Sequence, residues 1–485
     1  MNRVRDGNSY RDGLRAQRRN VWIDGERVGD VSTDKRLSTA VDTIASIFDY
    51  HTLPELQDKL CYTDPSGSRL PLSILQPRSA SQLRDRREAT EVIAHKTFGL
   101  VGRPPSFMNT VIAAFAASAD LFLTDDFAYP DNVRRYYEDL CSTQLYIAHA
   151  TIDPQDVRGA GDTFESRFGR LKVVSRRPEG LVVSGAKLVA TGGAIADDIA
   201  VFPLPGLAEG DDRRTCAFAI PVSTDGLHFV HRPPSGARST SLPHFPLASR
   251  FQEADCLCFF EDVFIPKERV FFMGSPDQAN SLYDATGARH LSAHHDLARA
   301  MIKLRFLAGL AILLARSGKV DSFPHVEEML GELIGFEAVA SGALASSEST
   351  SETLQSGLTV PNIRILRGLR YQMPRMFARA VQVIQAVGGA SLLIVPPTPA
   401  SAGDIEYLMT STFSSSVVSS ARRLAELTLA RDATTGEYGQ RQLLFEKYHA
   451  GDPVRLAALS YRFDADAAVD LAAACLRIFG EGPIE

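Results

Sequence analysis

Residues 180–193 read GLVVSGAKLVATGG and join two runs of β-forming residues through Ser184 and Gly185. Glycine favours tight turns, so this pattern predicts a β-hairpin. The second run stops at the corner Thr191–Gly193. Glycine leaves backbone N–H groups accessible and threonine adds a hydroxyl, so the corner offers hydrogen-bond donors without a bulky side chain. We therefore interpret this corner as a place where a planar cofactor can lie close to the backbone.

The sequence around this segment is typical of a β domain. Between residues 151 and 270, short runs rich in β-branched and aromatic residues alternate with clusters of Gly, Pro and Asp. The expected strands cover residues 171–174, 181–183, 216–220 and 257–260. Short strands that are separated by turn residues favour a compact antiparallel arrangement.

Helical periodicity flanks this β region on both sides. Apolar residues recur at three- and four-residue spacings in the N-terminal part, and long apolar segments of the same period predict a bundle beyond Arg289. The expected helices include residues 41–48, 111–115, 297–314, 326–340, 363–387 and 413–431, with a proline-rich break at 395–399. We expect an α+β protein with an N-terminal helical domain (1–150), a β-barrel-like domain (151–270) and a C-terminal helical bundle with a tail (271–485).

Composition and charge limit the possible partners. The chain has 485 residues, 45% of them hydrophobic, so it can bury a large core in two or three structural units. Its net charge of −6 and pI near 6.0 argue against nucleic acid and anionic membranes, which select basic surfaces. The N-terminus is charged, and no run approaches the roughly 18 apolar residues of a membrane span. We expect a cytoplasmic protein that binds small molecules.

Neither the cysteines nor the histidines predict a metal site. The six cysteines are scattered and form no CxxC pair, which is typical of reduced thiols. His290, His294 and His295 lie close together in HLSAHHD, but their spacing mixes the faces of a helix and no cysteine or carboxylate motif accompanies them. We therefore expect no metal.

A family resemblance rests on seven segments that follow one another in order along nearly the whole chain. They are WIDGERV (22–28), GRPP (102–105), LYIAHA (145–150), the segment 180–193, PLASRF (246–251), DVFIP (262–266) and YHAGD (448–452). In this order the chain resembles the oxygenase component of two-component flavin-dependent monooxygenases, the 4-hydroxyphenylacetate 3-monooxygenase family. The resemblance implies the acyl-CoA dehydrogenase-like fold, which has the same order of helical, β and helical parts.

The resemblance also implies the chemistry and its residues. FADH2 or FMNH2 would react with O2 to give a C4a-hydroperoxyflavin, which hydroxylates a phenol-type aromatic substrate. Arg103 matches the family's pocket arginine, whose positive charge favours the ionised phenol. His149 matches the histidine that contacts the substrate as hydrogen-bond partner and possible proton acceptor. Some chlorophenol-type relatives use a histidine in the region of His294 and His295, so both are catalytic candidates.

Phe107 departs from the family pattern, because the phenol hydroxylases carry tyrosine at this position. A pocket that lacks this hydroxyl should hold a phenolate less firmly. We therefore expect 4-hydroxyphenylacetate to be a poor substrate, and a substituted phenol, a carrier-bound tyrosine or an amine to be admitted.

The flavin site follows from the same resemblance. The candidate cofactor-binding residues are His149, Thr191, Gly192, Gly193, Gln385 and Gly388, with the last two contributed by a neighbouring subunit of a homotetramer. No GxGxxG motif follows a strand, so the chain shows no NAD(P)H site. Reduced flavin should therefore come from a separate NAD(P)H-flavin reductase.

The sequence leaves other functions open. N-hydroxylation and oxidative dehalogenation share the same oxidant and differ only in pocket shape. An acyl-CoA dehydrogenase-like oxidoreductase would need a catalytic carboxylate in the C-terminal bundle, for which Glu406 and Glu437 lack a surrounding pattern. A 4-hydroxybutyryl-CoA dehydratase would need an iron–sulfur cluster, and no cysteines lie between Cys61 and Cys141. A scaffold without catalysis is disfavoured by the presence of Arg103 and His149.

Overall fold

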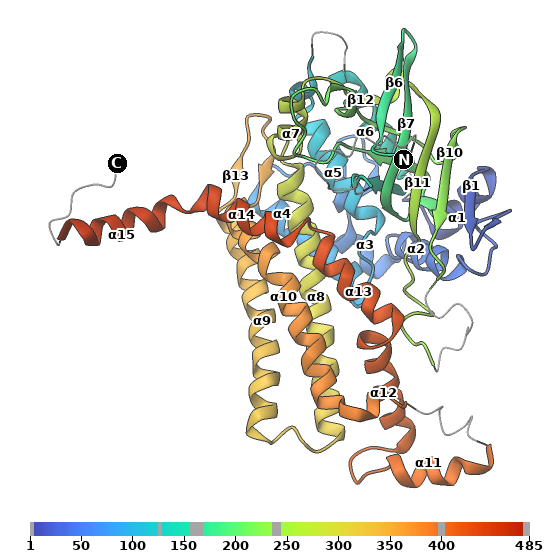
Figure 1. The fold of residues 1–485 in the computed structure, drawn as a ribbon, viewed down its shortest axis with the longest axis vertical. Coiled ribbons are helices and arrows are strands. Elements are labelled where there is room, and N and C mark those ends of the chain that lie inside the picture. The colour runs from blue at the N-terminus through green and yellow to red at the C-terminus, as the bar shows by residue number, and fades with distance from the viewer. Residues whose placement is uncertain (1–3, 125–128, 155–167, 235–243, 396–402, 479–485) are drawn as a thin grey trace, which may run out of the picture.

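The computed structural model describes residues 4–124, 129–154, 168–234, 244–395 and 403–478. Its strands gather at one end of the molecule, and the long helices α8, α9 and α10 run away from them side by side (Figure 1). This order of helical, β and helical parts confirms the expected α+β class. Residues 396–399 of the proposed proline-rich break lie outside the described residues.

Helices make up most of the N-terminal part. Their bounds are α1 (Gly7–Ala16), α2 (Ser38–Tyr50), α3 (Pro54–Leu60), α4 (Ala80–Lys96), α5 (Pro105–Ala117) and α6 (Tyr129–Thr143). The helices predicted at 41–48 and 111–115 are confirmed within α2 and α5. This part also contains β1 (Asn20–Ile23), β2 (Glu26–Arg27), β3 (Cys61–Thr63), β4 (Arg69–Pro71) and β5 (Ile147–Ala150). Because β1 pairs in parallel with β10, residues 20–23 belong to the main sheet.

The β region contains two main sheets. A six-stranded sheet has the order β2-β1-β10-β11-β7-β6, and a four-stranded sheet has the order β12-β9-β8-β5. The remaining strands are β6 (Lys172–Arg177), β7 (Gly180–Thr191), β8 (Asp198–Val201), β9 (Ala217–Pro221), β10 (Leu227–His231), β11 (Asp255–Pro266) and β12 (Val270–Phe272). Each of the four predicted strands overlaps one of these.

The hairpin predicted at Ser184 and Gly185 is wrong, because β7 continues through both residues. Ser184 pairs with β6 and Gly185 pairs with β11, so this strand is held on both edges. Gly185 has a φ of +135°, and a Cβ there would lie 2.6 Å from the Cα of Leu171. The glycine therefore permits a close approach of backbones inside a strand rather than a turn. The end of the strand at Thr191 is as predicted.

The C-terminal part is built from long helices. They are α7 (Pro276–Ala285), α8 (Ala288–Ser317), α9 (Pro324–Ser349), α10 (Ile363–Gly388), α11 (Glu406–Phe413), α12 (Ser420–Thr434), α13 (Glu437–Tyr448), α14 (Pro453–Asp464) and α15 (Asp466–Ile478), with a hairpin of β13 (Glu352–Thr353) and β14 (Thr359–Val360). The segment predicted at 413–431 is wrong at its start. The Ser419 side chain accepts a hydrogen bond from Arg422 N and caps a new helix that begins at Ser420.

Helix α8 links the two hydrophobic cores. One core joins the N-terminal helices to the sheets and includes Ala288 and Leu291, whereas the bundle core begins at Ala293. The polar residues in the first third of α8 therefore lie where the N-terminal helices, the sheets and the helical bundle meet. By length and composition α9 is apolar enough to cross a membrane, and in this structure it packs against α8 and α10.

Candidate active site

Arg103 lies in a rigid turn that leads into α5. The backbone N–H groups of Gly102 and Arg103 donate to Glu253 Oε1 at 2.8 and 2.9 Å, and Pro105 begins the helix. A Cβ on Gly102 would lie 2.1 Å from the ring of Phe445, so glycine lets α13 close over the turn. The turn thus fixes the backbone from which the guanidinium extends.

The Arg103 guanidinium is enclosed by aromatic rings and a carboxylate. Its Cζ lies 4.1 Å from the Phe107 ring centroid and 5.3 Å from that of Phe445. Its Nη1 donates to Asp296 Oδ1 at 3.3 Å, and Nη2 donates to the carbonyl of His449 at 3.1 Å. Asp296 thereby balances the charge of the arginine.

Asp296 is itself held by a second partner, since His449 Nε2 lies 3.3 Å from Asp296 Oδ2. Burial alone would raise the pKa of this carboxyl group, but His449 and Arg103 hold the pKa far below its ordinary value. The carboxylate is therefore ionised and fixes Arg103 between α8 and the end of α13.

His149 lies on β5 and is surrounded by aromatic rings. Its ring centroid is 5.7 Å from those of Phe107 and Phe202 and 6.4 Å from that of Tyr283. Burial, aided by the charges of Arg103 and Lys187, lowers the pKa of His149 to about 3, so the ring is neutral near pH 7. Its Nε2 atom is buried and makes no hydrogen bond in the structure. A neutral imidazole with a free ring nitrogen can accept or donate a hydrogen bond to a ligand.

The structure separates the two adjacent histidines of α8. His295 faces Phe107, with ring centroids 6.0 Å apart, and its Nε2 lies 2.8 Å from Ser106 Oγ. Its Nδ1 is buried without a hydrogen-bond partner, and burial lowers its pKa to about 3. His294 instead places Nε2 2.9 Å from Glu348, which also pairs with Arg87. Only His295 of this pair lies beside the ring that contacts Arg103.

The glycine corner packs against other parts of the same site. A Cβ on Gly192 would lie 2.0 Å from the hydroxyl of Tyr146, and one on Gly193 would lie 2.8 Å from Cys256 Sγ. The Tyr146 hydroxyl donates to the carbonyl of Arg103 at 3.1 Å. The Thr191 hydroxyl donates to Asp255 Oδ1 at 2.8 Å, which leaves its lone pairs available to accept a further bond.

Gln385 and Gly388 lie apart from these residues within one chain. They are near the C-terminal end of α10, at the end of the bundle away from the sheets (Figure 1). Glu406 and Glu437, the two carboxylates considered for a dehydrogenase, are both exposed on the surface. In the described part of the chain, no group of three His, Cys, Asp or Glu side chains is placed to hold a metal ion.

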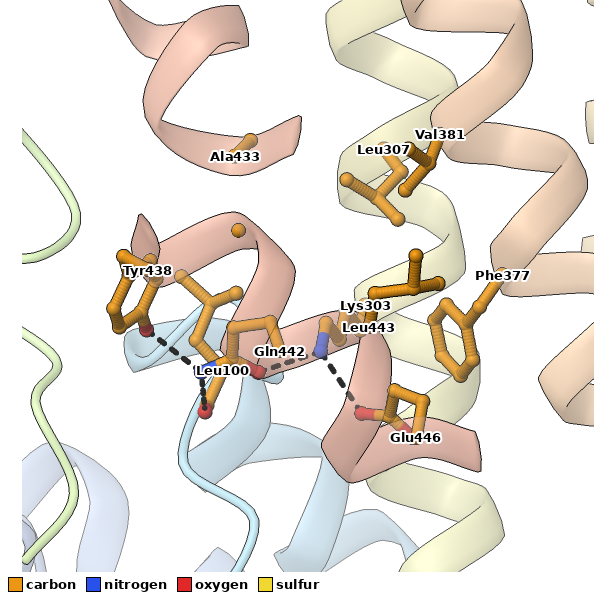
Figure 2. Close-up of a pocket in the computed structure, with 11 residues that line it drawn as sticks. Leu100, Lys303, Leu307, Phe377, Val381, Ala433, Tyr438, Gln442, Leu443 and Glu446 are labelled. Atoms are coloured by element: carbon orange, nitrogen blue, oxygen red, sulfur yellow. Dashed lines mark hydrogen bonds and ion pairs between the residues drawn. The ribbon is translucent and has the colours of Figure 1, made fainter. Parts of the chain in front are cut away.

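A buried polar network behind the site joins α8 to α13, as Figure 2 shows. Lys303 Nζ donates to Gln442 Oε1 at 2.6 Å and to Glu446 Oε1 at 2.9 Å. Arg299 also binds Glu446, at 2.8 and 3.1 Å. Lys303, Gln442 and Glu446 border a cavity with about 10 Å³ of water-accessible volume, close to the least that holds one water molecule. The network holds α13 against the helix that carries Asp296.

Sequence reasoning missed Asp296, Phe445 and the role of His449. The segment YHAGD contributed to the family resemblance, but no local pattern indicated that His449 would contact an aspartate more than 150 residues away along the chain. Asp296 is the one acidic residue of α8 among several basic ones, which was the available signal for it.

Comparisons with known proteins identify the family of the chain. Residues 6–272 match the family model 4-hydroxyphenylacetate 3-hydroxylase N terminal, and residues 279–477 match 4-hydroxyphenylacetate 3-hydroxylase C terminal. The chain is 33% identical to the 4-hydroxyphenylacetate 3-monooxygenase oxygenase component of Thermus thermophilus over 94% of both chains. It is 30% identical to a probable 4-hydroxyphenylacetate 3-monooxygenase of Bacillus subtilis, over 94% of this chain and 95% of the other.

Solved structures show the same fold. A crystal structure of the oxygenase component of 4-hydroxyphenylacetate 3-monooxygenase complexed with FAD and 4-hydroxyphenylacetate has a TM-score of 0.91 and 32% identity, covering 98% of each chain. An archaeal 4-hydroxybutyryl-CoA dehydratase has a TM-score of 0.88 at 18% identity, covering 100% of this chain and 96% of the other, which shows the fold alone. The chain therefore belongs to the 4-hydroxyphenylacetate 3-hydroxylase family of flavin-dependent monooxygenases, with the acyl-CoA dehydrogenase-like fold predicted from its sequence.

Proposed function

We propose that this chain is the oxygenase component that hydroxylates a phenol-type aromatic compound held between Arg103, Phe107 and His149. The observation that carries the proposal is the buried Nε2 of His149, which has no hydrogen-bond partner and lies beside the ring over which Arg103 is placed. Buried polar atoms are almost always paired, so an unpaired one next to a fixed cation indicates a ligand contact.

Each residue has a defined task toward the substrate. The Arg103 charge stabilises the phenolate, which is more reactive at its ortho carbon than the neutral phenol. His149 is neutral and offers its unpaired Nε2 as a hydrogen-bond partner to the phenol oxygen, and its lowered pKa makes it a weak proton acceptor. His295 also has an unpaired ring nitrogen, lies beside Phe107, and is the better catalytic candidate of the two adjacent histidines. The surrounding rings of Phe107, Phe202 and Tyr283 exclude water.

The residues also fit a reduced flavin. When bound, FADH2 or FMNH2 together with O2 supplies the oxygen atom for hydroxylation. The lone pairs of the Thr191 hydroxyl and the backbone at Gly193 would receive the ring system, whereas the N–H of Gly192 already donates to the carbonyl of Ala254 at 2.8 Å. The free nitrogen of His149 is on β5, which packs against β7. Gln385 and Gly388 would reach a flavin only from a neighbouring subunit of a homotetramer. We place the enzyme in the cytoplasm.

Reduced flavin would come from a separate NAD(P)H-flavin reductase. The purified protein should therefore be largely colourless and should bind reduced flavin more tightly than oxidised flavin. Flavin titration under nitrogen and in air measures both affinities. If NAD(P)H supported turnover without an added reductase, the requirement for a separate reductase would be contradicted.

Stopped-flow mixing of the reduced-flavin complex with O2, followed by product analysis on a panel of phenols and amines, tests the proposal. Arg103→Ala and His149→Ala should each slow oxygen transfer by about ten- to ten-thousand-fold while leaving the fold intact. Matched controls are Arg305→Ala, which removes a surface ion pair with Glu337, and His228→Ala on β10. If both site variants keep the wild-type coupling of flavin oxidation to product, the assigned pocket is wrong.

A further inference from the structure

Thr191 and Asp255 face each other where the glycine corner leaves the large sheet. Thr191 is the last residue of β7, Asp255 is the first residue of β11, and the two are direct partners in the ladder between these strands. The Thr191 hydroxyl donates to Asp255 Oδ1 at 2.8 Å. This hydrogen bond therefore lies at the strand end that leads into Gly192 and Gly193.

The Asp255 carboxyl group is ionised. Arg441 of α13 donates to both of its oxygens, through Nε to Oδ2 at 2.9 Å and through Nη2 to Oδ1 at 2.7 Å. Arg232 donates through Nε to Oδ2 at 3.0 Å. Burial alone would raise the pKa of Asp255, but Arg441 and Arg232 hold the pKa well below its ordinary value. The group therefore carries no proton that it could donate.

The ionised partner decides how the Thr191 hydroxyl can bind a ligand. A carboxylate only accepts hydrogen bonds, so the single hydroxyl proton of Thr191 is directed toward Asp255. The hydroxyl oxygen then offers a ligand its lone pairs alone. The N–H of Gly192 is also occupied, because it donates to the carbonyl of Ala254 at 2.8 Å. The hydroxyl that the sequence indicated as a donor is therefore an acceptor.

The two redox states of a flavin differ in what they present to such an oxygen. The ring nitrogen N5 has a lone pair in oxidised flavin and an N–H group in reduced flavin. An oxygen that can only accept pairs with the N–H group, whereas it leaves the lone pair of the oxidised ring without a donor. A buried polar group that lacks its partner changes an affinity by about tenfold or more.

We propose that Asp255 is a positioning residue that orients the Thr191 hydroxyl as an acceptor, so that the site selects reduced over oxidised flavin. The inference rests on the proposed function, which places the flavin ring at Thr191. Arg441 fixes Asp255 from α13, and its Nη1 binds Glu253, whose other oxygen accepts the backbone N–H of Arg103. The same arginine thus joins the flavin corner to the turn that carries the arginine of the phenol pocket.

The test measures the dissociation constants of oxidised and reduced flavin by calorimetry, in air and under nitrogen, with FAD and with FMN. The parent protein should bind the reduced form of at least one flavin about tenfold more tightly or better. Asp255→Asn keeps an oxygen for the arginines and can donate its NH2 group to the Thr191 oxygen, which frees the hydroxyl proton. Oxidised flavin should then bind more tightly than in the parent, and reduced flavin less tightly. A site that is merely damaged would not gain affinity.

Thr191→Val and Thr191→Ser test the same contact without changing a charge, and they decide the question if Asp255→Asn does not fold. Valine has a similar shape but no hydroxyl, so it should weaken the binding of reduced flavin by about tenfold and should not weaken that of oxidised flavin. Serine keeps the hydroxyl and should retain most of the preference for reduced flavin.

Asp198→Asn is the matched control. Asp198 accepts a hydrogen bond from the Tyr136 hydroxyl at 2.9 Å and pairs with Arg269 at 3.1 Å, so it is also a buried carboxylate between a hydroxyl and an arginine. This variant should leave the ratio of the two flavin affinities unchanged.

Parallel losses of both affinities in Asp255→Asn or in Thr191→Val would overturn the inference, since the contact would then serve the fold alone. So would a parent protein that binds both redox states equally well or binds neither. If the redox preference and its response to Asp255→Asn are present but no phenol gives coupled product, the proposed function fails and the inference stands.

Discussion

The guanidinium carbon of Arg103 lies 4.1 Å from the centre of the Phe107 ring, and the same ring lies beside both His149 and His295. Phe107 is only 4% exposed, so any group added to its ring lies in buried surroundings. The ring therefore determines how polar the space between the cation and the two histidines is.

Phe107→Tyr should raise the turnover of simple phenols and lower that of the natural substrate. The added hydroxyl restores a donor for phenolate, but with a substrate that offers it no partner a buried hydroxyl costs roughly 1–3 kcal/mol. Initial rates of product formation with 4-hydroxyphenylacetate, in the parent and in the variant, measure the effect. Efficient hydroxylation of that compound by the parent, unchanged in Phe107→Tyr, would show that this ring does not face the substrate.

Gly192→Ala should destabilise the protein and detach Tyr146 from the Arg103 turn. Gly192 has a φ of +84°, which costs other L-residues about 1–2 kcal/mol, and the new Cβ would overlap the Tyr146 hydroxyl. We expect a loss of about 2–4 kcal/mol in the free energy of unfolding, measured with denaturant. Gly210→Ala is the matched control, because Gly210 has a φ of +90° with open space around it. Equal losses in the two variants would mean that contact with Tyr146 contributes nothing.

The order of elements could be predicted from sequence because it depends on periodicity. The apolar period of residues 363–387 lies within α10, and residues 257–260 lie within β11. The hairpin at Gly185 could not be distinguished from a strand, since the reason for that glycine is the backbone of Leu171 on another segment. The apolar period of residues 413–431 continues across the break before Ser420, so the pattern did not indicate that break.

The site could be predicted only in part, because contacts between segments that are distant in the sequence form much of it. Arg103 and His149 lie in recognisable local motifs, so the family pattern indicated them. Asp296 acquires its role from contacts with Arg103 and His449, which periodicity does not show. Nor does spacing along α8 tell which of His294 and His295 meets Glu348.

The neutral state of the pocket histidines predicts a distinct pH dependence of stability. The pKa values of His149 and His295 are lowered to about 3, whereas a histidine in the unfolded chain titrates near 6.5. Between these values the unfolded chain binds protons that the folded chain does not, so stability falls as the pH falls from 6.5 toward 3. His149→Gln should reduce this slope by up to about 1.4 kcal/mol per pH unit. The exposed His325, changed to Gln, should leave the slope unaltered.

The assembly is predicted to be a homotetramer. Helix α15 extends from the body of the molecule (Figure 1), and apolar side chains on α14 and α15 such as Tyr461, Phe463 and Leu471 are 66–77% exposed. Exposed apolar surface of this extent is typical of an interface between subunits. Light scattering at micromolar concentrations should report the mass of four chains. Val469→Glu combined with Leu471→Glu should lower that mass, and a monomeric parent protein would exclude Gln385 from any shared flavin site.

Lys303 predicts a second pH dependence, in the alkaline range. Burial lowers the pKa of Lys303 to about 8 despite the attraction of Glu446, whereas a lysine in the unfolded chain titrates near 10.4. Below pH 8 both states carry the proton, so the cost of burying the charge is fully present. Between about pH 8 and 10.4 the unfolded chain binds more protons at this site, so the stability contribution of Lys303 rises with pH.

Lys303→Met should remove this rise, which amounts to at most about 1.4 kcal/mol per pH unit. Methionine suits the apolar wall formed by Leu307, Phe377 and Leu443 (Figure 2), and Glu446 keeps its two bonds to Arg299. Denaturant unfolding at pH 7, 8, 9 and 10 measures the slope. Lys447→Met on the exposed face of α13 is the control and should behave like the parent. A slope that persists in Lys303→Met would mean that Lys303 is not the group that titrates between pH 8 and 10.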